Sequence, residues 1–231
     1  MISKYQAKYF AHAITKEGGE GPERIQQSLL NAAVDLNPHQ IDAALFALHS
    51  PLSKGCLLAD EVGLGKTIEA GLVLCQLWAE RKRKLMVVCP ASIRRQWQCE
   101  LLEKFNLPSE IVDAKRMREL AREGVSNPFD IPKVVVASYN FAAKMADLVR
   151  LVEWDYVIVD EAHKMRNSYR ASNRIGHALR FALSGKKKAL LTATPIQNNL
   201  TELYGVSTMI DESLYGDLGI DAAKFMFVAD N

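Results

Sequence analysis

The sequence lacks the segments that carry proteins into or across membranes. No apolar run approaches the length of about 20 residues that a membrane-spanning helix needs. The opening residues, MISKYQAKYF, do not show the charged-then-apolar order of a secretion signal. Internal repeats, low-complexity stretches and Pro/Ser-rich linkers are also missing. We therefore expect a globular cytoplasmic protein with no membrane partner.

Paired cysteines are absent as well. The four cysteines form no CxxC pair and do not stand at zinc-ligand spacing with a histidine: Cys56, Cys75, Cys89 and Cys99. Cys56 and Cys89 fall in apolar, strand-like runs, which favours buried thiols in a reducing compartment over metal or redox roles. A chain of 231 residues with 48% apolar content can build a large core without disulfides or structural metals.

Charge of one sign is not in excess. The chain has 29 basic and 27 acidic residues, a formal net charge of +2. A groove binder can concentrate its cations on one face at such a total, so the balance neither requires nor excludes nucleic acid. Two basic runs, at residues 81–84 and 186–188, each lie between an expected helix and an expected strand. We interpret both as solvated turns.

Apolar β-branched runs alternate with amphipathic stretches from residue 38 onward. Expected strands cover residues 55–59, 85–89, 133–138, 156–160 and 188–192, with a short one near Ile111. Expected helices cover residues 38–49, 66–81, 93–105, 115–122, 141–151, 172–183 and 200–210. Runs such as VVVAS and YVIVD are apolar at consecutive positions, as in strands covered on both faces. The pattern predicts an α/β fold, a parallel sheet with helices on both faces, whose ligands bind at the carboxyl ends of the strands.

The front of the chain follows a different pattern. Apolar residues stand near helical spacing over residues 2–16 and again over 22–34, with a glycine-rich break between them. We therefore divide the chain into an N-terminal helical extension, residues 1–35, and one α/β domain, residues 36–231.

The strongest motif is a glycine-rich loop between the first expected strand and the helix after it. Its residues are Asp60, Glu61, Val62, Gly63, Leu64, Gly65, Lys66 and Thr67. Glycines let backbone N–H groups form an anion nest, and the positive end of the following helix points at the same place. Lys66 can reach the outer phosphates of a nucleotide, and Thr67 can ligate Mg²⁺. The general pattern GxxxxGK[ST] has glycine at the position of Asp60, so a glycine-rich turn with an incidental lysine is the alternative.

Two adjacent carboxylates follow the apolar run YVIVD. Asp160 can hold a Mg²⁺ ion, largely through the water shell of the ion. Glu161 can orient and deprotonate an attacking water. Adjacent acids after a strand are common by chance, but this pair follows a phosphate loop with the expected strands 85–89 and 133–138 between. The sequence therefore predicts nucleotide hydrolysis.

The last expected strand ends in two hydroxyl side chains. Thr192 and Thr194 precede a proline turn in the stretch LLTATPIQNN. These hydroxyls can hydrogen-bond the carboxylate pair and report the state of the outer phosphate. A strand-to-turn junction that merely uses threonine and proline is the alternative.

Together the three motifs resemble the first RecA-like lobe of the Swi/Snf-type ATPases in helicase superfamily two, over about residues 36–215. That family commonly carries aspartate at the position of Asp60, and residues 160–163 read DEAH. The resemblance implies ATP and Mg²⁺ as cofactors and a catalytic role for Lys66 beside the carboxylate pair. It also implies that His163 and the two threonines couple the motifs. The stretches EVGLGKTIEAG and EKFNL are most similar to the bacterial branch that includes the RNA-polymerase-recycling ATPase.

Two further elements carry the same resemblance. His39 and Gln40 stand in the stretch LNPHQ, which resembles the family's adenine-reading element, with Gln40 pairing with the base edge. Ser92 lies in a stretch that resembles motif Ia, which also contains Gln96-Trp97, and Ser138 and Tyr139 lie in one that resembles motif Ib. In the family these motifs lie along the nucleic-acid track, which makes the three residues candidate phosphate contacts. Helix capping is the alternative role.

The resemblance implies a motor that moves along nucleic acid, expected to be duplex DNA, or remodels protein bound to it. Such motors need a second RecA-like lobe that supplies arginine fingers, and we expect that lobe in a longer protein. One alternative is that this lobe alone is a nucleotide- or nucleic-acid-binding module with negligible hydrolysis. Another phosphate-loop enzyme, such as a small-molecule kinase, would leave the LTATP stretch unexplained.

Overall fold

The computed structural model describes residues 37–50, 54–59, 65–165, 168, 172–194 and 201–211. The helices expected over residues 2–16 and 22–34 lie outside these ranges, so they stay predictions. Within the described ranges, no helix combines the length and the apolar content that crossing a bilayer would take.

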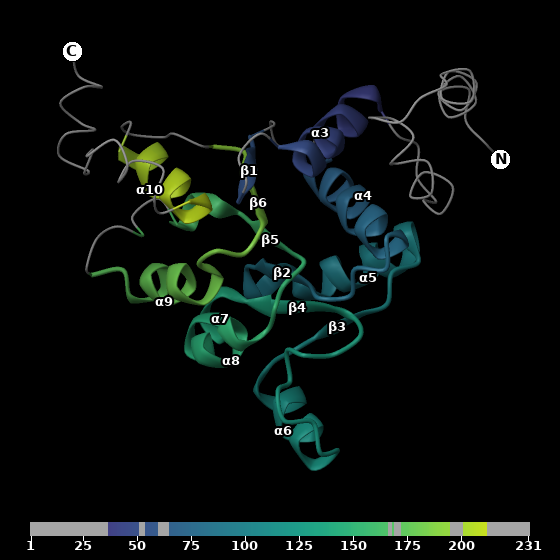
Figure 1. Ribbon diagram of the computed structural model, residues 1–231, viewed down its shortest axis with the longest axis vertical. Helices are drawn as coiled ribbons and strands as arrows, with labels where there is room; N and C mark the ends of the chain where they lie inside the picture. The colour runs from purple at the N-terminus through teal and green to yellow at the C-terminus, as the bar shows by residue number, and fades with distance from the viewer. Residues whose placement is uncertain are drawn as a thin grey trace.

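Six parallel strands form one sheet at the centre of the domain (Figure 1). The strands are β1 (Gly55–Leu58), β2 (Leu85–Cys89), β3 (Ser109–Ile111), β4 (Val134–Ser138), β5 (Tyr156–Asp160) and β6 (Lys188–Leu191). Their order across the sheet is β1-β6-β5-β2-β4-β3, and every pairing is parallel. The predicted α/β class is confirmed, and each expected strand matches to within one residue at either end.

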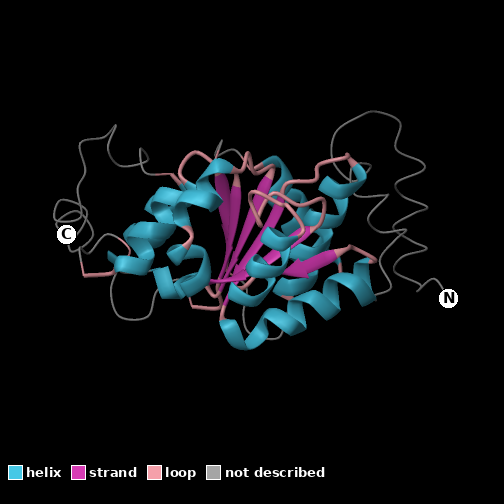
Figure 2. Ribbon diagram, turned by 90° about the horizontal axis from the view of Figure 1, so that it is seen from below, coloured by secondary structure: helices cyan, strands magenta, loops and turns pink. Residues whose placement is uncertain are grey.

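Helices cover both faces of this sheet (Figure 2). The α-helices are α3 (Pro38–His49), α4 (Lys66–Ala79), α5 (Arg94–Phe105), α6 (Ala114–Arg122), α7 (Tyr139–Lys144), α8 (Ala146–Leu151), α9 (Arg174–Leu183) and α10 (Thr201–Ile210). Two short 3-10 helices follow strands, η2 (Ala91–Ile93) after β2 and η3 (Ala162–Met165) after β5.

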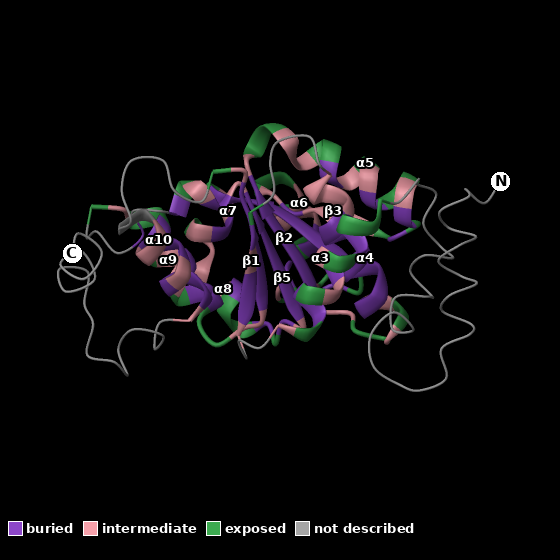
Figure 3. Cartoon of the chain, turned by 90° about the horizontal axis from the view of Figure 1, so that it is seen from above, coloured by how far each residue is buried: buried purple, intermediate pink, exposed green. Residues whose placement is uncertain are grey.

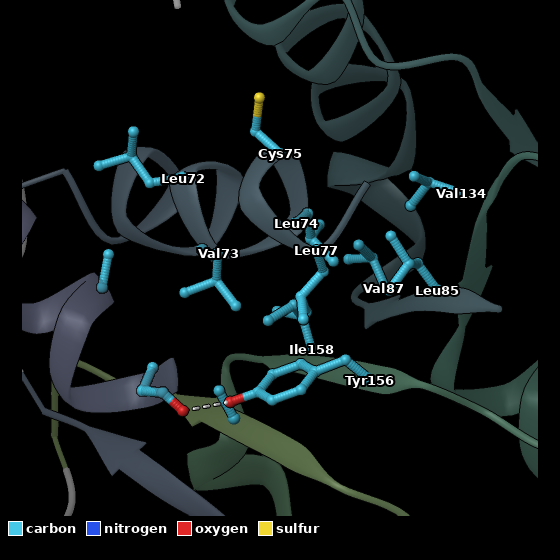
Figure 4. Packing of buried hydrophobic residues seen from close by; sticks show 14 of the residues in the cluster. Leu72, Val73, Leu74, Cys75, Leu77, Leu85, Val87, Val134, Tyr156 and Ile158 are labelled. Carbon is cyan, nitrogen blue, oxygen red and sulfur yellow. Dashed lines mark hydrogen bonds between the residues drawn. The ribbon is translucent and has the colours of Figure 1, made fainter. Parts of the chain in front are cut away.

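Alternation along the strands divides the buried side chains between two cores. In β5, Tyr156 and Ile158 belong to the core with α3, α4 and α5, whereas Val157 and Val159 belong to the core with α6 to α10. Figure 4 shows the first core, with Val73 and Leu77 on the side of α4 that faces Tyr156 and Ile158. Strands β2, β4, β5 and β6 are buried along their whole length, whereas the edge strand β3 is partly buried and the outer helix surfaces are exposed (Figure 3). This double burial explains the consecutive apolar positions in the sequence.

The first core is packed tightly where α4 crosses α5. A Cβ atom added at Gly71 would lie 2.1 Å from a ring atom of Phe105. Phe105 is itself buried, so its ring has little room to withdraw. Glycine at this position therefore sets the distance between the two helices that carry Lys66 and Trp97.

Two predictions from the sequence are wrong. The single helix expected over residues 141–151 is two helices, α7 and α8, separated at Met145, whose φ and ψ of −106° and 29° leave the helical region. Both halves pack against α9, so the break bends the chain around that helix. Lys188 begins β6, as the expected strand 188–192 requires, but it also ends the basic run 186–188 that was interpreted as a solvated turn. Lys188 is instead buried at 1% exposure, and its Nζ donates to the carbonyl of Ile210 at 3.1 Å. That carbonyl ends α10, where a cation is favoured by the helix dipole.

Candidate nucleotide-binding site

The carboxyl ends of three neighbouring strands bring the predicted motifs to one edge of the sheet. β6 lies between β1 and β5, and Asp160 at the end of β5 is in register with Leu191 at the end of β6. The backbone N–H of Thr192 donates to the carbonyl of Leu58 at the end of β1, at 3.0 Å. The glycine-rich segment follows β1 and leads into α4. The acidic pair, the threonines and the start of α4 thus share the edge at which parallel sheets bind ligands.

Gly65 shapes the start of α4. It stands at the N-cap with φ 92° and ψ 35°, a left-handed conformation that favours glycine. A Cβ atom there would also lie 2.3 Å from the side-chain nitrogen of Gln40. The first N–H groups of a helix have no partner within it and attract anions, which suits a phosphate beside half-buried Lys66 and Thr67.

The other predicted phosphate contacts, Asp60, Glu61, Val62, Gly63 and Leu64, lie outside the described residues. Their role stays a prediction.

Gln40 lies where α3 meets the phosphate loop. Its side chain is buried, its Oε1 accepts from the backbone N–H of Asn37 at 3.2 Å, and its nitrogen lies beside Gly65. His39, the neighbouring residue, is exposed. The structure therefore brings Gln40 against the loop, while adenine reading by either residue stays a prediction.

Both carboxylate oxygens of Asp160 are held by N–H donors. Trp97, on α5, donates from Nε1 to Oδ2 at 2.8 Å. The backbone N–H of Glu161 donates to Oδ1 at 2.8 Å. Burial raises the pKa of Asp160 above its usual range, while these two hydrogen bonds and the charge of Lys66 act to lower it. The charge of Lys66 thus favours the anionic form of Asp160, against the larger and opposite effect of burial on the pKa.

Trp97 has no role in the prediction from sequence, although its stretch resembles motif Ia. The indole and the carboxylate are 63 residues apart in the chain, and only the placement of β2 beside β5 joins them.

Glu161 differs from Asp160 in its exposure, its backbone conformation and its neighbours. The Glu161 side chain is 41% exposed, whereas Asp160 is a buried residue. Its backbone is left-handed, with φ 56°, and its carbonyl accepts from the N–H of Lys164 at 3.1 Å in the turn that starts η3. Its Oε2 lies 3.0 Å from Nδ1 of His163, without the alignment of a hydrogen bond. A solvent-facing carboxylate beside a fixed one suits the predicted roles, in which Glu161 orients water and Asp160 holds Mg²⁺.

The two threonines form a local turn. Thr192 is buried, and its Oγ1 accepts from the backbone N–H of Thr194 at 3.2 Å. This bond belongs to the strand-to-turn junction that was the alternative interpretation. The predicted coupling of Thr192, Thr194 and His163 to the outer phosphate stays a prediction.

The three predicted nucleic-acid residues differ in exposure. Ser92 is exposed on η2. Ser138 is buried and caps α7, accepting from the N–H of Phe141 at 3.3 Å. Tyr139 is buried and its hydroxyl donates to the main-chain oxygen of Asp160. The capping alternative is therefore present at Ser138, and contact of these residues with phosphate stays a prediction.

A pocket of about 190 Å³ opens beside these residues, at the ends of β2 and β4. We call it the β2–β4 pocket. It is lined by Pro90, Ala91, Ser138, Tyr139, Asn140, Lys164, Met165, Asn173 and Ile175. Its walls thus combine the segments that follow β2, β4 and β5, with Lys164 as the exposed cation.

The residues present fit a magnesium ion that is held partly by a nucleotide. Within the described ranges, no group of three or more histidine, cysteine or acidic side chains could enclose a metal by itself. Mg²⁺ does not need such a cage, because it binds through one or two protein oxygens, substrate phosphates and water. Asp160 and Thr67 would supply hard oxygen ligands of this kind.

Comparison with known proteins agrees with the geometry. A family model described as an SNF2-related domain matches residues 5–226. Among solved structures, the chain is similar to one described as the Sulfolobus solfataricus SWI2/SNF2 ATPase core in complex with dsDNA, with 25% sequence identity and a TM-score of 0.68. The similarity covers 84% of this chain and 39% of that one.

Proposed function

The chain belongs to the family of SNF2-related domains, and from this premise we propose that it is the ATP-binding lobe of a motor that moves along duplex DNA. The observation that carries the proposal is the placement of Lys66, at the start of α4 after β1, and Asp160, at the end of β5, at one edge of the sheet. A phosphate-binding cation and a fixed carboxylate are the two parts that phosphoryl transfer needs most.

Each residue has a distinct part in this proposal. Lys66 and the N-terminus of α4 bind the outer phosphates, and Thr67 and Asp160 hold Mg²⁺. When bound, Mg²⁺ neutralises charge that develops on the phosphate oxygens. Glu161, open to solvent, orients the attacking water and accepts its proton. Gln40, beside Gly65, contacts the base of the nucleotide.

Duplex DNA is the proposed partner. The similar Sulfolobus solfataricus ATPase core is described in complex with dsDNA. In this chain, the β2–β4 pocket presents Lys164 and two asparagines, Asn140 and Asn173, which are groups that contact phosphate oxygens. We propose that the DNA backbone passes this pocket and that hydrolysis drives movement along it or displaces bound protein.

The test is ATP turnover by the full-length protein with duplex DNA, single-stranded DNA, RNA or no nucleic acid. We expect strong stimulation by duplex DNA. Turnover indifferent to every nucleic acid would contradict the motor and leave a nucleotide-binding switch.

Substitution of the phosphate-loop lysine tests the site itself. Lys66→Ala is expected to lower turnover at least about 100-fold, because it removes charge stabilisation of the transferred phosphoryl group. Lys115→Ala is the control, since Lys115 is 83% exposed on α6. Retention of turnover in Lys66→Ala would show that the phosphate loop is wrongly assigned.

We further propose, from the stretches EVGLGKTIEAG and EKFNL, that the protein belongs to the bacterial branch that includes the RNA-polymerase-recycling ATPase. Co-purification of the full-length protein with core polymerase would support this placement. Absence of any interaction, with duplex-stimulated turnover intact, would reject the placement and keep the motor.

A further inference from the structure

Asp160 is held from both faces of the sheet by buried aromatic side chains. In the first core, Trp97 Nε1 donates to the carboxylate oxygen Oδ2 at 2.8 Å. In the second core, the hydroxyl of Tyr139 donates to the main-chain oxygen of the same residue. Trp97 is 1% exposed and Tyr139 is 6% exposed, so water does not compete for either bond. The carboxylate and its peptide group are therefore fixed independently.

Both aromatic residues belong to segments that border the β2–β4 pocket. Trp97 lies in the first turn of α5, which begins directly after η2, and Ala91 of η2 lines the pocket. Tyr139 lines the pocket itself and begins α7. A ligand in the pocket would therefore touch one of the two donors directly and would lie about two helical turns from the other.

We infer that Trp97 and Tyr139 are positioning residues that couple nucleic-acid phosphate in the β2–β4 pocket to the orientation of the Asp160 carboxylate. The inference rests on the proposed function and adds a physical route from the DNA to the nucleotide. In this inference, DNA phosphate bound in the pocket holds η2 and α7 in place and thereby shortens the hydrogen bonds from Trp97 and Tyr139 to Asp160. The metal-nucleotide then binds with higher affinity. By linkage, the metal-nucleotide favours DNA to the same degree.

A simpler account is that buried indole and phenol groups always find some hydrogen-bond partner. The chain itself supplies the comparison that separates the two accounts. Trp154 is buried, and its Nε1 donates to the carbonyl of Val149 at 2.9 Å. Tyr156 is buried, and its hydroxyl donates to the carbonyl of Ala47 at 3.2 Å, the dashed line in Figure 4. Neither bond involves Asp160.

The experiment compares four single variants of the full-length protein. Trp97→Phe and Tyr139→Phe remove a donor to Asp160, whereas Trp154→Phe and Tyr156→Phe remove an equally buried donor elsewhere. A fluorescent, non-hydrolysable ATP analogue reports nucleotide binding as Mg²⁺ is titrated, with and without duplex DNA. The midpoint of that titration is the readout, and thermal unfolding is followed in parallel.

We expect Trp97→Phe to raise the Mg²⁺ midpoint about tenfold or more, the usual effect of removing a partner of a metal-binding carboxylate. We expect duplex DNA to lower the midpoint of the unaltered protein, and this DNA-induced shift to shrink towards nothing in Trp97→Phe and Tyr139→Phe. The variants at Trp154 and Tyr156 should lose stability yet keep both the midpoint and the shift.

Equal midpoints and equal shifts in Trp97→Phe and Trp154→Phe would overturn the inference, because the bond to Asp160 would then be merely structural. Should Trp97→Phe fail to fold, Tyr139→Phe compared with Tyr156→Phe decides the question, since each loses only a hydroxyl. Failure of the proposed function is recognised separately. If duplex DNA does not change the ATP turnover of the unaltered protein, the proposed function is rejected. If duplex DNA stimulates that turnover but Trp97→Phe and Tyr139→Phe keep the Mg²⁺ midpoint and the DNA-induced shift of the unaltered protein, this inference alone is rejected.

Discussion

The two faces of the sheet are buried to a similar degree but carry different candidate sites. The face covered by α3, α4 and α5 carries Gln40, Lys66 and the Asp160 side chain. The face covered by α6 to α10 carries the β2–β4 pocket with Lys164. Since strand side chains alternate, one run of five residues can build a wall of both compartments. The end of β5 therefore contributes to the candidate nucleotide site and also adjoins the β2–β4 pocket.

Glu161, at the strand end that the two faces share, gives the strongest test of this comparison. We expect Glu161→Gln to lower ATP turnover at least about 100-fold, because the amide cannot accept the proton of water. Nucleotide and DNA binding should persist, because the glutamine side chain has the same size as the glutamate side chain and both are non-glycine residues at the same left-handed φ. Turnover and binding are measured side by side in the full-length protein. Glu153→Gln is the control, because Glu153 is 90% exposed and pairs with Lys186. Equal loss in both variants would mean that charge alone matters.

Gly71→Ala sharpens the comparison through packing of the first face. The added methyl group meets the buried ring of Phe105, and overpacking of this kind costs about 1–3 kcal/mol of unfolding free energy. Chemical denaturation of the protein measures the loss. The double variant Gly71→Ala/Phe105→Leu should lose less than the two single losses combined, because the smaller side chain makes room. Additive losses would show that the two residues do not press on each other.

Lys164→Ala probes the second face with the smallest expected effect. We expect affinity for duplex DNA to fall about threefold to tenfold, and the slope of log affinity against log salt to decrease by about one unit. Binding isotherms at several salt concentrations measure both quantities. Lys144→Ala is the matched control, because Lys144 is exposed on α7 but does not line the pocket. Identical salt slopes for the two variants would remove the pocket from the DNA path.

Much of this arrangement could be predicted from the sequence because it follows from local rules. Consecutive apolar runs indicated doubly covered strands, and the ends of such strands placed Lys66 and Asp160 at one edge. The bonds of Trp97 and Tyr139 to Asp160 span 63 and 21 residues, and they depend on β5 lying beside β2 and β2 beside β4. Spacing along the chain carries no information about that order.

The two wrong predictions have related causes. No proline or glycine marks the break at Met145, which instead follows from the packing of α7 and α8 on α9. Lys188 stands in a basic run that looks solvated, but its ammonium group donates to the carbonyl of Ile210 at the end of α10, 22 residues later. In both cases tertiary contacts decided against the local pattern.

The left-handed backbone of Glu161 has a consequence for any search among variants. A non-glycine residue at φ 56° costs roughly 1–2 kcal/mol, whereas glycine adopts this conformation without strain. A screen that scores only survival on heating would therefore accept glycine at position 161. With the role proposed for Glu161, such survivors would be stable but would not hydrolyse ATP, so a selection for activity has to measure turnover from its first round.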